Sequence, residues 1–293
     1  MARPKDGPMT VTVVTDSAAA LPADRLERHD IRVVPLVLHV GDDRYRDDEI
    51  ALDDLVSRFE EPISTAAPSP GEFATTIADA LRTGPVVVLT VAAGISSTHD
   101  AAKLAAKLVL GDRPIGEPGD DAAVTVIDTG TAAGAQGLVV LAAARAAEAG
   151  ADLDTVVATA EQVAGRVRLA ATVADLERLA RSGRVPDAAR WIGDRLGVRP
   201  MFEFRDGRAR PLRPAFSADA ALDRIVQRCA AGAADGARLH ASVLHALNPE
   251  AAETLLERVS ALAPASCLVG PFSPVMVAHT GRGLVGLAWW WEQ

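Results

Sequence analysis

The chain has 293 residues and a formal net charge of −9, with 30 Lys and Arg against 39 Asp and Glu. This length is enough for two domains with separate cores, and the acidic balance leaves no sustained basic surface for releasing counterions from nucleic acid. Aromatic residues make up only 4% of the chain, so aliphatic side chains would line any cavity, which disfavours ligands that stack on rings.

The two cysteines, Cys229 and Cys267, both fall in apolar stretches. Two isolated thiols are too few for a zinc site or a disulfide framework, so we expect both in the core and no bound metal. The chain does not open with a charged segment followed by an apolar one, and no apolar run reaches the length of a membrane span. The sequence therefore predicts a soluble, cytoplasmic protein without stable membrane insertion.

The first half of the sequence alternates strands with helices, after an irregular leader at residues 1–8. The predicted strands lie at 11–14, 31–40, 86–91 and 123–127, and the predicted helices at about 22–28, 52–59, 70–81, 99–110 and in an Ala-rich segment after 131. Pro35 indicates an edge or a bend, and Ser69 with Glu72 is typical of a capping box. Such alternation indicates a parallel sheet with crossover helices, whose ligands bind at the carboxyl ends of the strands.

The second half mixes hairpin and crossover connections, which predicts a mixed sheet with helices. The predicted helices lie at 153–164, 176–185, 191–196, 218–229 and 250–262, and the extended segments at 200–204, 208–212, 239–247, 266–269 and 284–291. Asp206-Gly207 is a strong hairpin signal. The fold class is therefore α/β with two domains, 1–160 and 161–293.

The segment from Gly94 to Thr98 has the character of an anion site. It follows a buried strand and leads at once into a helix, so Ser96, Ser97 and Thr98 occupy the N-cap and the first turn. The unpaired N–H groups and the positive end of the helix dipole would suit a carboxylate or a phosphate. The alternative is that these hydroxyls only cap the helix. The sequence has neither GxGxxG nor Gly-x4-Gly-Lys-Ser/Thr, which argues against dinucleotides and nucleoside triphosphates.

Six polar motifs occur in a distinctive order along the chain. They are Thr15-Asp16-Ser17, Thr65-Ala66-Ala67-Pro68-Ser69, Gly94-Ile95-Ser96-Ser97-Thr98, Asp128-Thr129, Ser182-Gly183-Arg184 and His279-Thr280-Gly281. Their order and spacing resemble the DegV family over nearly the whole chain. The sequence departs from the family pattern at Ser97, where Gly is frequent, and at Arg282, where Pro is frequent.

The resemblance implies a protein that binds one long-chain fatty acid between its two domains, with the carboxylate in the polar loops and the acyl chain in an apolar tunnel. It also implies that a separate fatty acid kinase receives the bound acid and makes the acyl phosphate, so the chain itself needs no catalysis and no cofactor. Carried over by position, Thr65, Ser96 and His279 are the expected carboxylate ligands. Thr280 and the amides of Ser96 and Ser97 are the expected helpers.

Four further residues are expected behind these ligands. Asp16, Ser17 and Asp128 end strands beside the expected site, where an Asp commonly orients a following turn or helix. Arg184, together with Arg181, would pair with a kinase or a phosphate, and the alternative is that both are exposed charges at a helix end.

Two other classes of function remain open from the residues. Ser96 as nucleophile, with His279 as base and Asp16 or Asp128 as orienter, would make an acyl hydrolase, although residues 94–98 lack the second Gly of a nucleophile elbow. A binder of a small phosphorylated ligand, on a fold like that of dihydroxyacetone kinases, is the third class. No cluster of Lys or Arg accompanies the hydroxyl loops, which disfavours a doubly charged ligand.

Overall fold

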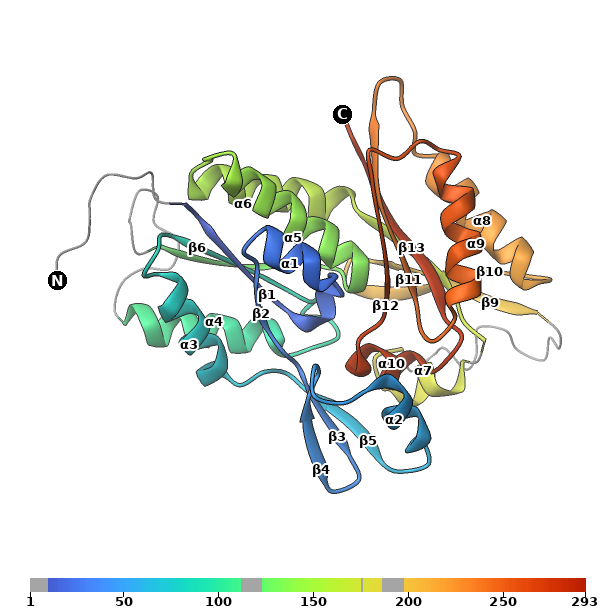
Figure 1. Cartoon of the computed structure of the whole chain (residues 1–293), viewed down its shortest axis with the longest axis horizontal. Helices are drawn as coiled ribbons and strands as arrows, with labels where there is room; N and C mark the ends of the chain where they lie inside the picture. Colours follow the sequence, from blue (N-terminus) through green and yellow to red (C-terminus); the bar gives the residue numbers. More distant parts are fainter. Residues whose placement is uncertain (1–9, 112–122, 175, 186–197) are drawn as a thin grey trace.

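The strands of the protein form three sheets in a computed structural model that describes residues 10–111, 123–174, 176–185 and 198–293. The expected leader at 1–8 and the expected helix at 191–196 lie outside the described residues. Figure 1 shows the parallel sheet on the left, the mixed sheet on the right and a small antiparallel sheet below them. The expected α/β fold, with a parallel and a mixed sheet, is confirmed.

The parallel sheet has the strand order β2-β1-β6-β7. Its members are β1 (Thr12–Asp16), β2 (Arg32–Val34), β6 (Val86–Thr90) and β7 (Val124–Asp128). Each neighbouring pair is parallel, so the carboxyl ends of all the strands meet at one edge. β1 and β6 are buried along their whole length, as expected for central parallel strands with helices on both faces.

The outer face of this sheet is covered by α3 (Pro70–Ala80) and α4 (Thr98–Leu110), whose apolar sides pack on its valines. A short turn of 3-10 helix, η1 (Ser17–Ala19), and α1 (Ala23–Arg28) follow β1. The capping box at the start of α3 is confirmed, because the Glu72 amide donates to the Ser69 hydroxyl at 3.2 Å and the Ser69 amide donates to the Glu72 carboxylate at 2.7 Å.

Helix α5 (Ala133–Glu148) lies between the two large sheets, with α6 (Leu153–Arg166) packed beside it. It contacts β1 and β6 on one side and β11 and β13 on the other, and it is buried over most of its length. Two glycines permit this close approach: a Cβ at Gly134 would lie 2.6 Å from the Ser242 hydroxyl, and one at Gly137 would lie 2.6 Å from the Ala19 carbonyl oxygen. The expected domain boundary at residue 160 falls within α6 and stays a prediction.

The mixed sheet has the order β10-β9-β8-β13-β11-β12, and only the β11–β12 pair is parallel. Its strands are β8 (Arg168–Thr172), β9 (Arg199–Arg205), β10 (Arg208–Ala215), β11 (Arg238–His245), β12 (Ser266–Pro271) and β13 (Val285–Glu292). Helices α8 (Ala218–Ala230) and α9 (Pro249–Ser260) cover its outer face. The expected hairpin joins β9 to β10, with positive φ angles of 52° at Asp206 and 71° at Gly207.

The small sheet was not expected from the sequence. It has the order β4-β3-β5, from β3 (Val37–Val40), β4 (Asp43–Arg46) and β5 (Ile63–Ala66). The stretch 31–40 is therefore not one strand: the chain leaves the parallel sheet after β2 and joins the small sheet at β3, with the expected bend at Pro35 between them.

Three short helices surround the small sheet: α2 (Leu52–Ser57), α7 (Glu177–Arg181) and α10 (Pro274–Thr280). Helix α10 contacts β3, β5, α2 and α7, and so connects the small sheet to the mixed sheet (Figure 1). Within the described ranges, no helix combines the length and the apolar character needed to cross a bilayer.

Replacing Gly137 with Ala tests the close packing of α5. The new Cβ would lie 2.6 Å from the Ala19 carbonyl oxygen and 3.0 Å from Leu21, and overpacking of this kind costs about 1–3 kcal/mol. We expect Gly137→Ala to lower the free energy of unfolding by that amount in urea denaturation. The matched control is Gly165→Ala in α6, where a Cβ meets nothing within 4 Å. An equal loss in both variants would contradict the packing argument.

Candidate functional site

Three of the residues singled out in the sequence meet where the small sheet faces α10. The Thr65 hydroxyl, on β5, lies 2.9 Å from Nε2 of His279, in the last turn of α10. Arg184 donates from Nη2 to the same hydroxyl at 3.2 Å. Residues far apart in sequence thus present a hydroxyl, an imidazole and a guanidinium at one point.

The electrostatics of this group are those of a neutral imidazole beside an uncompensated cation. Burial, together with the positive charge of Arg184, lowers the pKa of His279 to about 4. Burial also lowers the pKa of Arg184, and its other hydrogen bond goes to the Ser182 carbonyl oxygen. In the described part of the chain no carboxylate forms an ion pair with Arg184, so its charge is available to a ligand with one negative charge.

A cavity of about 460 Å³ opens beside these groups. Its polar lining includes Thr65, Arg184 and His279, together with Ser96 and Ser97. The rest is mostly apolar: Ala18, Leu36, Val91, Ile95, Val275 and Met276. A cavity with one polar end and an apolar body fits an amphipathic ligand.

The loop that carries Ser96 ends as expected at the start of α4. Ser97 is the N-cap residue and is exposed. The Ser96 hydroxyl accepts from the Thr98 amide at 3.3 Å and lies 2.7 Å from the Thr98 hydroxyl. Ser96 therefore has a local partner and still faces the cavity.

Two of the expected orienting carboxylates hold this loop. Asp16 accepts from the Val91 amide at 2.8 Å, at the start of the loop, and Asp128 accepts from the Ala93 amide at 3.2 Å. Asp16 is completely buried, and burial raises its pKa to about 6. Neither carboxylate lines the cavity, so both act on its shape through the backbone.

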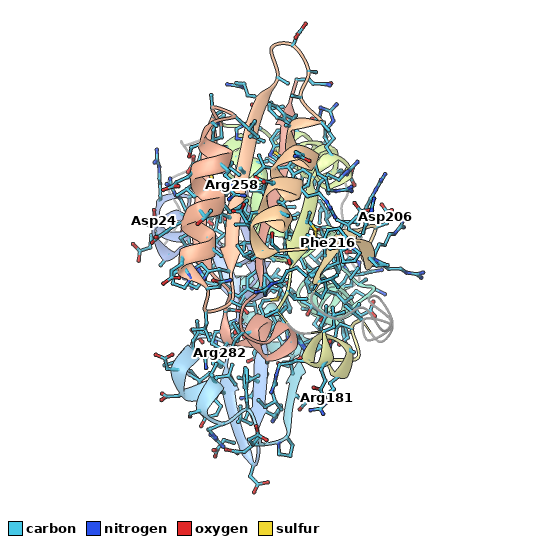
Figure 2. The ribbon with its side chains drawn as sticks, turned by 90° about the vertical axis from the view of Figure 1, so that its right-hand side faces the viewer. Asp24, Arg181, Asp206, Phe216, Arg258 and Arg282 are labelled. Atoms are coloured by element: carbon cyan, nitrogen blue, oxygen red, sulfur yellow. The ribbon has the colours of Figure 1, made fainter. Side chains whose placement is uncertain are left out.

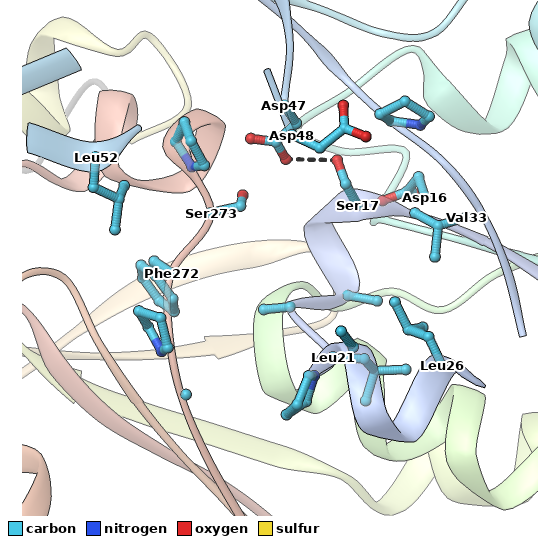
Figure 3. Close-up of a pocket in the computed structure, with 18 of the residues that line it drawn as sticks. Asp16, Ser17, Leu21, Leu26, Val33, Asp47, Asp48, Leu52, Phe272 and Ser273 are labelled. Atoms are coloured by element: carbon cyan, nitrogen blue, oxygen red, sulfur yellow. Dashed lines mark hydrogen bonds between the residues drawn. The ribbon is translucent and has the colours of Figure 1, made fainter. Parts of the chain in front are cut away.

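Ser17, also expected behind the ligands, does not line this cavity. Its hydroxyl donates to Asp47 at 2.6 Å and accepts from the Leu36 amide at 3.0 Å. The second oxygen of Asp47 accepts from the Val275 amide at 2.7 Å, at the start of α10. Figure 3 shows this Ser17–Asp47 bond at the edge of a separate cavity of about 670 Å³, which Ser17 and Asp16 line.

Thr280, expected as a helper of the carboxylate ligands, turns toward its own helix. Its hydroxyl donates to the Met276 carbonyl oxygen at 3.0 Å, and the residue is buried without lining the cavity. It therefore closes α10 in this structure, and its contact with a ligand stays a prediction.

Sequence reasoning did not find two residues that support the site. Asp47 stands in an acidic run with Asp48 and Glu49, yet it joins η1 to α10. Gln136 lies fully buried in the Ala-rich helix α5 and donates to the Asp16 carboxylate at 3.2 Å. A lone amide among apolar residues was the available signal for Gln136, whereas no local pattern separates Asp47 from its acidic neighbours.

A second, more polar cavity of about 600 Å³ adjoins the same residues. It shares Thr65, Arg184 and His279 with the first cavity, and it is also lined by Arg181 and Glu61. The polar end of the first cavity, called the amphipathic cavity below, is thus shared with a second cavity. Among the described residues, no group of three or more His, Cys, Asp or Glu is placed to share a metal ion.

Comparison with known proteins decides the family. The family model described as an uncharacterised protein of the DegV family matches residues 10–292. The chain belongs to the DegV family. A DegV domain-containing protein of Streptomyces coelicolor is 36% identical over 284 residues, which cover 94% of this chain and 97% of that protein.

Solved structures of DegV proteins have the same fold. One, described as fatty acid binding of a DegV family protein from Thermus thermophilus, has a TM-score of 0.87 at 30% identity, covering 96% of this chain and 99% of that one. Another, DegV from Bacillus subtilis, described as a fatty acid binding protein, has a TM-score of 0.83 at 27% identity, covering 97% and 100%. Both coverages extend over all three sheets of this DegV protein.

The lowered pKa of His279 makes the stability of the folded chain depend on pH, and the sign of this dependence is defined. The pKa of His279 is about 4 in the folded chain against 6.5 without perturbation, so the stability it contributes is present above pH 6.5 and is lost as the pH falls toward 4. We expect the NMR signals of the His279 ring to titrate near pH 4. Arg184→Gln should raise this pKa, whereas Arg82→Gln, at an exposed arginine on another surface, should leave it unchanged. Titration of His279 near its unperturbed pKa in the wild type would contradict the assignment.

Proposed function

We propose that this DegV protein binds one long-chain fatty acid in the amphipathic cavity, with the carboxylate at Thr65, Ser96, His279 and Arg184. The observation that carries the proposal is the meeting of hydroxyls, a neutral imidazole and a guanidinium that has no ion-pair partner among the described residues, at the polar end of an apolar cavity. The fatty acids described for the related structures support the same ligand class. Native mass spectrometry of the purified protein, followed by analysis of the released lipid, is the direct test.

The two ends of the ligand would contribute differently to binding. Each buried methylene is worth about 0.8 kcal/mol, so a long acyl chain supplies most of the affinity. Hydrogen bonds to a carboxylate are worth about 1.5–3 kcal/mol each and depend on direction, so the polar groups orient the ligand. One uncompensated cation at the site suits a monoanionic carboxylate better than a dianionic phosphate.

Ser96 and His279 are better suited to binding than to hydrolysis. Among the described residues, the Ser96 hydroxyl is bonded to Thr98, and Nε2 of His279 is bonded to Thr65. A serine nucleophile needs a hydrogen bond to its base, and no such bond joins Ser96 to His279. We therefore assign no catalytic step to these two residues.

We further propose that a separate fatty acid kinase phosphorylates the bound carboxylate from the side of the second, more polar cavity. Thr65, Arg184 and His279 line both cavities, so a carboxylate at these residues lies between them. Arg181 projects beside the small sheet, with a side chain that is 77% exposed (Figure 2). An exposed arginine at this opening would attract the anionic phosphate donor or an acidic surface of the kinase.

Removing single hydroxyls tests the carboxylate ligands. Thr65→Val and Ser96→Ala should each weaken fatty acid binding about 10- to 100-fold, because each removes one hydrogen bond to a charged group. Calorimetric titration of delipidated protein with a long-chain fatty acid measures the change. Thr254→Val and Ser57→Ala are the matched controls, because these hydroxyls donate to carbonyl oxygens within their own helices. Unchanged affinity in both test variants would refute the assignment of the head-group site.

Charge removal at Arg181 tests the proposed partner. With a fatty acid kinase from the same organism, Arg181→Ala should reduce acyl phosphate formation several-fold while fatty acid binding stays unchanged, because Arg181 lies outside the amphipathic cavity. The control is Arg82→Ala, another exposed arginine whose side chain is 80% exposed. Equal rates for the two variants would exclude Arg181 from the kinase contact.

A further inference from the structure

A second cluster of reactive side chains lies at the amino ends of β11 and β12, near the chain end marked C in Figure 1. The Ser266 hydroxyl is 2.7 Å from Nδ1 of His240, and Nε2 of His240 is 3.0 Å from the Glu292 carboxylate. Strand register creates this order, because His240 is paired with Ser266 on one side and with Trp290 on the other. Helix α10 follows the opposite end of β12, roughly 20 Å away along the strand.

The hydrogen bonds of His240 define the roles of its two ring nitrogens. In the neutral ring, an N–H at Nε2 donates to Glu292, and the lone pair of Nδ1 accepts the Ser266 hydroxyl. This is the order of nucleophile, base and orienting carboxylate that activates a serine. Trp290 stacks on the imidazole, with ring centroids 4.9 Å apart and planes at 17°, and so limits tilting of the ring.

A cavity of about 380 Å³ gives this cluster space for a small substrate. Besides Ser266, His240 and Glu292, it is lined by the apolar residues Leu138, Leu141, Ala142, Ala146 and Trp290. Two arginines also line it: Arg238, which forms an ion pair with Glu292 at 2.7 Å, and the exposed Arg145, which forms no ion pair with any residue of the described ranges. The shape and lining favour a compact aliphatic group with a negatively polarised oxygen near Arg145.

The edge position of β12 supplies a second donor for that oxygen. The Ala265 amide donates to the Leu239 carbonyl oxygen at 2.8 Å, toward β11. Amides alternate in direction along a strand, so the Ser266 amide points away from β11, on the side where no strand of the described residues pairs with β12. This amide and the Arg145 guanidinium are of the donor types that stabilise an oxyanion.

We propose that Ser266 is the nucleophile of a second site that hydrolyses esters of short aliphatic acids, with His240 as the general base. The Ser266 oxygen bonds to the ester carbonyl carbon, and its proton passes to Nδ1 of His240. The carbon–oxygen bond to the alcohol then breaks, and the alcohol leaves with that proton. Water repeats the sequence on the acyl-serine and releases the acid. Glu292 is a positioning residue that holds the N–H of the ring at Nε2.

Diisopropyl fluorophosphate tests the nucleophile, because it forms a stable phosphoryl-serine with an activated serine and releases fluoride. We expect one phosphoryl group per chain, mapped by peptide mass spectrometry to Ser266. Ser266→Ala should abolish the label, and His240→Gln should slow labelling at least 10-fold. Ser260→Ala, at an exposed serine whose hydroxyl donates to a carbonyl oxygen of its own helix, should label like the wild type. No label, a label on Ser96, or labelling of Ser266 that does not depend on His240 would each overturn the proposal.

The variant Glu292→Gln tests whether Glu292 positions the His240 ring or only stabilises the fold. It should lower the maximal rate of labelling while the reagent concentration at half-maximal rate stays unchanged, and Glu292→Asp should restore part of the rate. A normal rate in Glu292→Gln would refute the role of Glu292. Hydrolysis of p-nitrophenyl acetate should follow the same order among the variants. Fatty acid content and thermal unfolding, measured on the same samples, show that each variant is folded and test the proposed fatty acid binding independently.

Discussion

Two buried carboxylates fix the geometry on which the candidate site depends. Asp16 and Asp47 are 0% and 3% exposed, and in the described part of the chain their bonds go to amides and neutral side chains rather than to cations. Burying a charge in this way is costly unless directed hydrogen bonds compensate for it. Asp16 therefore fixes the loop after β6, and Asp47 fixes the start of α10. These two segments carry Ser96 and His279.

The small number of charges at the candidate site bears on which ligand the proposed function would select. Thr65 and the neutral His279 ring satisfy each other by hydrogen bonding, and Arg184 adds a single positive charge. A second anionic oxygen at full charge would find no second cation among the described residues at the cavity. The apolar wall from η1 and α10 would favour a ligand with an aliphatic portion. A carboxylic acid with an alkyl chain satisfies both conditions.

Sequence patterns among neighbouring residues predicted the elements whose conformation depends on those neighbours. The capping box of α3, the hairpin at Asp206-Gly207 and the valine-rich parallel strands were expected, and the structure confirms them. Strand β4 was missed because its residues are charged and its conformation depends on pairing with β3. The approach of Thr65 to His279 spans 214 positions, and only the resemblance to a family placed these residues in one site. Asp47 was missed for the same reason: its partners are distant in the sequence.

The Thr65–His279 bond also gives the polar groups of the site partners within the protein. Polar groups next to an apolar cavity are destabilising when they have no hydrogen-bond partner. Here the hydroxyl and the imidazole are paired with each other, and Arg184 is bonded to the hydroxyl as well as to a carbonyl oxygen. Binding of a carboxylate therefore exchanges hydrogen bonds rather than adding all of them, so the net gain at the polar end is modest. Under the proposed function, the acyl chain would therefore contribute most of the affinity, and the polar end would determine which chemical group is accepted.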